Sequence, residues 1–238
     1  MPKLVFIHGP GAGACADSFY FQLKQFPGSV APSLPGHLEG RRCPDVKSYA
    51  EWVRGWLWAQ GMTRDLVLIG YTLGAAIALQ YALDYPEEVK GVIAMTVAIR
   101  PKTRAPGAYD LRIRAANDPK AFEEWLEFQR HVMKFVEPGL KEQLMKRHLQ
   151  IGPMSQLHDL QAIDAFDARD RIAALKPRLL LVRGLDDPGK PPEYEKEIHE
   201  ALPDSRYVKI SGAGHFPATE KPVEINKLIE EFVASLPA

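Results

Sequence analysis

The segment that most constrains the fold of this chain is residues 66–76, which read LVLIGYTLGAA. A short apolar run leads into Gly70 and Gly74, which flank Thr72, and small residues follow. This pattern predicts a buried strand at 66–70, a sharp turn centred on Thr72 and a closely packed helix at 73–83. The turn would expose the central hydroxyl at the carboxyl edge of a sheet, where the N–H groups that begin the helix favour negative charge.

The rest of the chain alternates apolar runs with helical patterns. Besides residues 66–70, strands are expected at 4–7, 91–97, 179–182 and 207–210, with a weaker strand at 29–34. Helices are expected at 19–26 and at 192–202. Another is expected to follow a capping-box sequence that begins at Ser48. A last helix is expected near the carboxyl end, where apolar residues within 225–236 form a stripe. This alternation predicts an α/β fold with a mostly parallel sheet of about six strands and helices on both faces.

Residues 105–164 break the alternation, because they carry helical spacing and no convincing strand. Asp118-Pro119 is typical of a helix start, and Pro138-Gly139 separates two helices. We therefore predict an α/β core of residues 1–104 and 165–238, interrupted by a helical cap at 105–164.

Charge and composition exclude several classes of partner. The 238 residues include 30 basic and 30 acidic ones, and no stripe of one sign stands out, so nucleic acid is not an expected partner. The pair Arg41-Arg42 and the run 112–114 are expected to be solvated surface. No apolar run approaches the roughly 18 residues of a membrane helix. A homo-oligomer stays open.

Metal and cofactor signals are also missing from the sequence. Cys15 and Cys43 are too few for a disulfide framework, which favours reduced thiols in a cytoplasmic protein. The histidines at 131, 148 and 158 lack the close spacing of metal ligands. Residues 8–13 lack the Lys and Ser/Thr of a phosphate loop, so a nucleotide-binding domain is a weak alternative and no cofactor is expected.

Two further loops follow predicted strands and carry side chains suited to acyl transfer. Asp186 and Asp187 follow the strand at 179–182, and His215 follows the strand at 207–210. A hydroxyl needs a base to become a nucleophile near neutral pH, and a carboxylate orients the histidine and stabilises its cation. We expect these groups to converge with Thr72.

With the hydroxyl, the acid and the histidine in this order along the chain, the motifs resemble the α/β-hydrolase fold family. The resemblance spans nearly all of the chain. It implies that Thr72 is the nucleophile, that His215 is the base and that Asp187 rather than Asp186 is the acid. The matching segments are His8-Gly9 for the oxyanion loop, 34–37 for the loop after the next strand, 70–74 for the nucleophile elbow, 184–187 with Pro191 for the acid loop, and 212–217 for the histidine loop.

The sequence departs from the family pattern at three places. The chain starts at what would be the family's third strand, and Thr72 stands where the family has serine. Pro10 follows His8-Gly9, where the family supplies an oxyanion N–H, and proline has none. The second donor beside the Leu73 N–H is then either the N–H of Gly11 or missing, and such a loss costs roughly 10² to 10³ in rate. Pro10, Gly11 and Leu73 are expected to line the oxyanion and substrate site.

The resemblance implies a carboxylesterase-like hydrolase that cleaves a small or medium hydrophobic ester through a Thr-His-Asp triad and an acyl-enzyme. Two alternatives stay open: a lyase or C–C bond enzyme on the same scaffold, and a non-catalytic ligand-binding protein. Pro10 and Thr72 favour the binding protein, because each weakens a catalytic part, whereas the acid and histidine loops favour an enzyme. His8 and His37 are expected to brace their loops.

Overall fold

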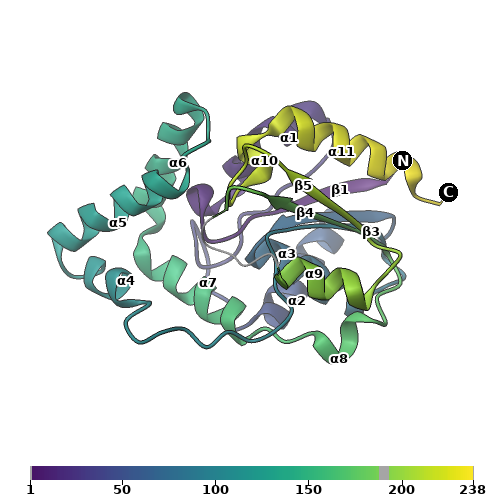
Figure 1. The fold of residues 1–238 in the computed structure, drawn as a ribbon, viewed down its shortest axis with the longest axis horizontal. Coiled ribbons are helices and arrows are strands. Elements are labelled where there is room, and N and C mark those ends of the chain that lie inside the picture. The colour runs from purple at the N-terminus through teal and green to yellow at the C-terminus, as the bar shows by residue number, and fades with distance from the viewer. Residues whose placement is uncertain (1, 188–192, 238) are drawn as a thin grey trace.

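The computed structural model describes residues 2–187 and 193–237 and is built around a parallel five-stranded sheet. The strand order along the sheet follows the chain, β1-β2-β3-β4-β5. Figure 1 shows the strands side by side, with both termini at one end of the molecule. The bounds of the strands are β1 (Lys3–Ile7), β2 (Leu66–Tyr71), β3 (Val89–Met95), β4 (Arg178–Gly184) and β5 (Arg206–Ile210).

The predicted α/β class is confirmed, but the sheet has five strands rather than about six. The expected strand at 29–34 is reduced to an isolated parallel bridge between Val5 and Val30. Pro32 follows two residues later and has no N–H with which to continue a ladder, which explains why pairing stops there.

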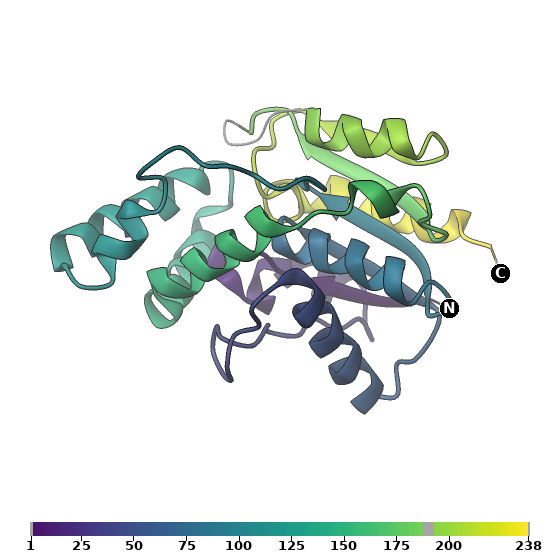
Figure 2. The same ribbon diagram turned by 90° about the horizontal axis from the view of Figure 1, so that it is seen from below.

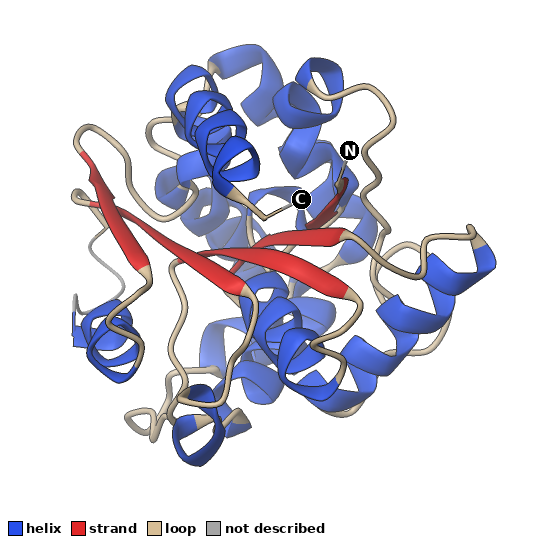
Figure 3. Cartoon of the chain, turned by 90° about the vertical axis from the view of Figure 1, so that its right-hand side faces the viewer, coloured by secondary structure: helices blue, strands red, loops and turns tan. Residues whose placement is uncertain are grey.

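Helices cover both faces of the sheet. Successive side chains along each strand point to opposite faces, and each face has its own apolar core beneath the helices. Leu68 belongs to the core beneath α2 (Val46–Ala59), α3 (Leu73–Asp84) and α9 (Glu193–Ala201). Its neighbour Ile69 belongs to the other core, with α1 (Tyr20–Gln25), α10 (Pro217–Glu220) and α11 (Pro222–Ser235). Figures 2 and 3 show these two helical layers on opposite sides of the strands.

Two helix starts test the sequence signals. Asp118 accepts from the N–H of Lys120 at 3.0 Å ahead of α5 (Pro119–Val132), as the sequence predicts. The predicted capping box at Ser48 is wrong, because the cap of α2 is Asp45, three residues earlier. The Asp45 carboxylate accepts from the Ser48 N–H at 2.7 Å, so Ser48 already lies inside the helix.

Five helices lie between β3 and β4 in the chain, and we call the first four, α4–α7, the inserted helices. They are α4 (Asp110–Ala115), α5, α6 (Pro138–Ile151) and α7 (Pro153–Ala165), and the short α8 (Arg169–Ile172) follows them. Figure 1 shows α4, α5 and α6 projecting beyond the sheet. The α6 helix is joined to the loop after β1, where the Gly13 N–H donates to His148 Nε2 at 3.0 Å. No helix among the described residues has both the length and the apolar character to cross a membrane.

Candidate active site

Thr72 occupies the turn between β2 and α3 in a strained backbone conformation. Its φ of 50° and ψ of −109° fall where β-branched residues are rare. The turn is held from both sides, because the Thr72 N–H donates to the Met95 carbonyl and its own carbonyl accepts from Ala76, both at 3.0 Å. The strain is therefore fixed by the adjoining strand and helix.

The glycines on either side of Thr72 are required by the packing of this turn. A Cβ at Gly74 would lie 1.9 Å from the carbonyl oxygen of Ile7 on β1. A Cβ at Gly70 would lie 2.3 Å from the backbone carbon of Gly74. The predicted steric role of both glycines is confirmed.

The hydroxyl of Thr72 is buried and makes no hydrogen bond in the described part of the chain. It lies against Gly9, where an added Cβ would be 2.1 Å from Oγ1. Gly9 thus leaves the room that this hydroxyl occupies, and any larger residue there would displace it.

His215 and Asp187 meet at the carboxyl edge of the sheet. His215 Nδ1 lies 2.8 Å from Asp187 Oδ2, and the two side chains are 22% and 1% exposed. Asp186 turns elsewhere and accepts from the Gly212 N–H at 2.8 Å. The structure therefore brings His215 and Asp187 together and places Thr72 on the same cavity, without a hydrogen bond between Thr72 and His215. Pro191 of the acid loop and Pro192, the expected start of α9, lie outside the described residues.

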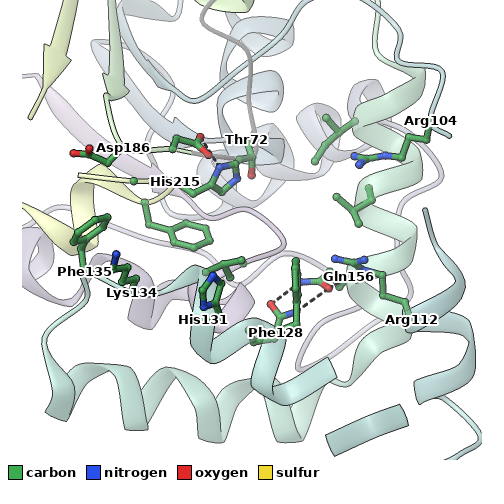
Figure 4. Close-up of a pocket in the computed structure, with 18 residues that line it drawn as sticks. Thr72, Arg104, Arg112, Phe128, His131, Lys134, Phe135, Gln156, Asp186 and His215 are labelled. Atoms are coloured by element: carbon green, nitrogen blue, oxygen red, sulfur yellow. Dashed lines mark hydrogen bonds and ion pairs between the residues drawn. The ribbon is translucent and has the colours of Figure 1, made fainter. Parts of the chain in front are cut away.

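A cavity of about 620 Å³ opens beside these groups, between the sheet edge and the inserted helices. Figure 4 shows Thr72 and His215 on one side and side chains of the inserted helices on the other. Much of the lining is apolar, and those residues are Phe128, Val132, Phe135, Leu160, Ile163 and Phe216.

The loop after β1 is fixed at two carbonyls. The Gln156 Nε2 amide donates to the Pro10 carbonyl at 3.1 Å, and the Tyr71 hydroxyl donates to the Gly11 carbonyl at 2.9 Å. Since C=O and N–H point in opposite directions across a trans peptide, the first bond turns the Gly11 N–H away from Gln156. Gly11 lines the cavity. The N–H of Leu73 begins α3 and has no partner within that helix.

Gln156 makes several buried hydrogen bonds at the cavity, and it was not identified as a site residue from the sequence. Its Oε1 accepts from Trp125 Nε1 at 2.9 Å, from Gln129 Nε2 at 3.2 Å and from Arg112 Nε at 3.0 Å. The available signal was Gln129, a polar residue within the apolar helical stripe of α5. A buried amide in such a stripe needs a partner, which here is the reciprocal amide of Gln156.

Arg112 also corrects an expectation, because it lines the cavity instead of pointing into solvent. The helix α4 packs against α5 and α7, which turns this side chain inward. Arg114, two residues on, is exposed and pairs with Glu124 at 3.2 Å, as expected for a surface residue.

His8 and His37 brace loops, as predicted. His8 Nε2 accepts from the Leu34 N–H at 2.9 Å, and His37 Nε2 lies 2.8 Å from Asp159 Oδ2. Burial acts to lower the pKa of His37, but the Asp159 carboxylate outweighs burial and the net shift is upward. Burial, together with the nearby His37, lowers the pKa of His8, which fits its role as a neutral acceptor.

Glu220 holds the histidine loop from behind. Its Oε2 accepts from the Gly214 N–H at 2.6 Å. Burial raises the pKa of Glu220 to about 7, and the carboxylates of Asp187 and Asp186 add to the shift.

Among the described residues, neither the cysteines nor the other ligand-type side chains form a second reactive or metal-binding centre. Both cysteines are free, and burial raises the pKa of Cys15 and of Cys43 to about 11, so both are protonated thiols at neutral pH. Within residues 2–187 and 193–237, no three His, Cys, Asp or Glu side chains gather as a metal site.

Sequence comparison agrees with the geometry. The model of the alpha/beta hydrolase family matches residues 4–228. The chain is 32% identical over 169 residues to the putative carbamate hydrolase RutD of Klebsiella pneumoniae, covering 67% of this chain and 62% of that protein. It is 28% identical over 216 residues to RutD of Cronobacter turicensis, covering 88% and 78%. The match thus spans about three fifths of the length of the Klebsiella relative.

Solved structures share the fold. An esterase from Thermogutta terrifontis, with malate bound, superposes with a TM-score of 0.81 at 22% identity over 98% of this chain and 90% of that one. The enol-lactonase from Burkholderia xenovorans superposes with a TM-score of 0.83 at 17% identity over 99% and 92%. Together with the family-model match over residues 4–228, these findings show that the chain belongs to the α/β hydrolase family.

Proposed function

We propose that the protein hydrolyses carboxylic esters through an acyl-enzyme formed on Thr72. The observation that carries the proposal is the contact of 2.8 Å between His215 and Asp187, on the same cavity as Thr72. A hydroxyl, an imidazole and a buried carboxylate are the three groups that acyl transfer needs.

Acylation would begin with rotation of the Thr72 side chain from Gly9 towards His215. As Oγ1 attacks the ester carbonyl, its proton passes to His215 Nε2, and the carbonyl electron pair moves onto oxygen. Asp187 holds Nδ1–H and stabilises the imidazolium. The tetrahedral intermediate collapses when the C–O bond to the alkoxide breaks and His215 gives that proton to the leaving alcohol.

Deacylation repeats these steps with water. His215 removes a proton from the water, whose oxygen attacks the acyl carbonyl. When the bond to Thr72 Oγ1 breaks, the proton returns to Oγ1, so the acid is released and the side chain is restored.

The oxyanion would form beside the backbone N–H groups of Leu73 and Gly11. Leu73 begins α3, so its N–H adds the positive end of the helix dipole. The fixed Pro10 carbonyl supports a Gly11 N–H that is preset before substrate arrives. Such preorganised donors stabilise a transition state more than mobile ones.

The substrate we propose is an ester with a small or medium apolar body. The apolar side chains of the inserted helices support this choice, and so does a volume of about 620 Å³. In this proposal the inserted helices act as a cap over the site. Because the sequence relatives are named as putative carbamate hydrolases, carbamates belong in the same test, since their carbonyl is attacked in the same way.

The test is turnover of 4-nitrophenyl esters with acyl chains of two to eight carbons, and of a 4-nitrophenyl carbamate. We expect ester hydrolysis that falls to background in His215→Ala and Thr72→Val, and a fluorophosphonate adduct on Thr72. Equal rates in the wild type and in His215→Ala would overturn the proposal. Ligand-induced stabilisation without turnover would assign the chain to the binding proteins instead.

A further inference from the structure

Arg112 reaches the cavity without a carboxylate partner in the described part of the chain. Its Nε donates to Gln156 Oε1 at 3.0 Å, and its guanidinium carbon lies 5.1 Å from the centroid of the Phe128 ring. An amide oxygen and an aromatic ring orient a guanidinium, but neither carries a charge that neutralises it. The positive charge of Arg112 is therefore left for another group.

The neighbouring arginines are neutralised, which sets Arg112 apart. Arg104 also lines the cavity, but it pairs with the Asp164 carboxylate, with an Nη2–Oδ1 distance of 2.9 Å. Arg114 lies on the same helix as Arg112, pairs with Glu124 and is not part of the cavity lining. The two arginines of α4 therefore differ, because Arg114 has a carboxylate partner and Arg112 has none among the described residues.

The surroundings of Arg112 disfavour an isolated cation. Burial, and then the positive charge of Arg104, lower the pKa of Arg112. An arginine nevertheless stays protonated in proteins, so the charge persists. A half-buried cation in such surroundings gains most from an anion that enters the cavity.

We infer that the natural substrate carries a carboxylate at the end that faces the inserted helices, and that Arg112 pairs with this carboxylate. The inference rests on the proposed ester hydrolase function. Figure 4 shows Arg112 across the cavity from His215, so the scissile ester and the carboxylate would lie at opposite ends of the substrate. The apolar lining between them suits a hydrocarbon chain.

The fit favours a carboxylate over a phosphate. With Nε held by Gln156, the two terminal nitrogens of Arg112 can donate to the two oxygens of one carboxylate. A phosphate dianion would need a second cation beside Arg112. However, Arg104 is already engaged by Asp164, and Lys134 lies across the cavity from Arg112. Gln156 also holds the Pro10 carbonyl, so the same side chain fixes Arg112 and the oxyanion loop.

The first test compares two esters that differ only at the far end: the 4-nitrophenyl monoester of adipic acid and 4-nitrophenyl methyl adipate. We expect the wild type to prefer the acid, and Arg112→Met to lower the ratio of the two kcat/KM values by about 10- to 100-fold. Arg112→Lys should give an intermediate ratio. Arg114→Met, on the same helix, is the matched control and should keep the wild-type ratio.

The second test measures binding and does not depend on turnover. Isothermal titration compares hexanoate with hexanamide, and we expect hexanoate binding to be weakened in Arg112→Met but not in Arg114→Met, once both variants are shown to melt cooperatively. Such a loss without any ester turnover would retract the hydrolase proposal and keep the carboxylate site. Equal hexanoate binding in both variants, or equal ester ratios, would overturn the carboxylate site, and tighter binding of hexyl phosphate would replace the carboxylate by a phosphate.

Discussion

Thr72 joins a left-handed backbone to a β-branched side chain. A φ of 50° at such a residue costs roughly 1–3 kcal/mol, so the surrounding structure must impose it. Its hydroxyl lies over Gly9, so the methyl group restricts rotation towards His215. Thr72 is thus positioned as a nucleophile but limited by its own methyl group.

Thr72→Ser removes this methyl and keeps the hydroxyl. We expect the rate of ester cleavage to rise about 2- to 10-fold, the equivalent of a rotamer restriction of about 0.5–1.5 kcal/mol, with the melting temperature unchanged or higher. Stopped-flow measurement of 4-nitrophenol release gives the rate, and Thr72→Val, which keeps the shape without the hydroxyl, is the inactive control. A slower serine variant would show that the threonine methyl assists catalysis.

Arg112 illustrates what the local sequence could not reveal at the scale of one residue. In the run 112–114 two arginines flank Ile113, and a surface interpretation suits both of them equally. In the structure Ile113 is 50% exposed while Arg112 turns to the cavity and Arg114 turns outward. This choice is made by the docking of α4 onto α5 and α7, which no pattern within three residues encodes.

The turn between β2 and α3 requires residues without side chains, which are Gly70 and Gly74 on either side of Thr72. We expect Gly74→Ala to lower the free energy of unfolding by about 1–3 kcal/mol, because the new Cβ would overlap the Ile7 carbonyl. Gly55 is the matched control, since it lies exposed in α2 with nothing within 4 Å of an added Cβ. Gly55→Ala should raise the free energy of unfolding by about 0.5–1 kcal/mol, because alanine is the better helix former. Urea unfolding measures both, and equal signs would contradict this account.

Elements with strong local sequence signals were predictable, whereas elements for which two sequence signals compete were not. The apolar strands and the Asp118-Pro119 helix start lie where the sequence indicates. The α2 start moved to Asp45 because two capping residues lie close together, and the earlier one begins the helix. The weak strand at 29–34 was lost because Pro32 prevents pairing beyond Val30.

At the scale of the whole molecule, the rule that parallel strands end at one edge placed part of the candidate site. It indicated that Thr72, Asp187 and His215 would converge, and all three line one cavity, although Thr72 makes no hydrogen bond to His215. Gln156 and Arg112, on the far wall, come from inserted helices whose docking depends on long-range contacts. The sequence signal for Gln156 was its partner Gln129, a polar residue within the apolar helical stripe of α5, whereas Arg112 had no such signal.

Two buried groups that join distant parts of the fold respond to pH in opposite senses. His148 accepts from Gly13, and burial lowers the pKa of His148 from 6.5 to about 4. Between those values the unfolded chain binds a proton that the folded chain refuses, so stability falls as the pH falls. Burial raises the pKa of Glu220 from 4.5 to about 7, so there the folded chain holds a proton that the unfolded chain releases, and stability rises as the pH falls.

In the wild type these two contributions oppose each other between pH 4.5 and 6.5, so single variants are needed to separate them. The stability advantage of the wild type over His148→Asn, whose amide can still accept from Gly13, should shrink by about 2–3 kcal/mol from pH 7.5 to 4.5. The advantage over Glu220→Gln should instead grow by about 3 kcal/mol across the same range. Urea unfolding at a series of pH values measures both differences, in which the titration of all other groups cancels. Differences that stay constant with pH would mean that water reaches both side chains in the folded protein. The contacts of His148 with Gly13 and of Glu220 with Gly214 would then be more hydrated than their burial implies.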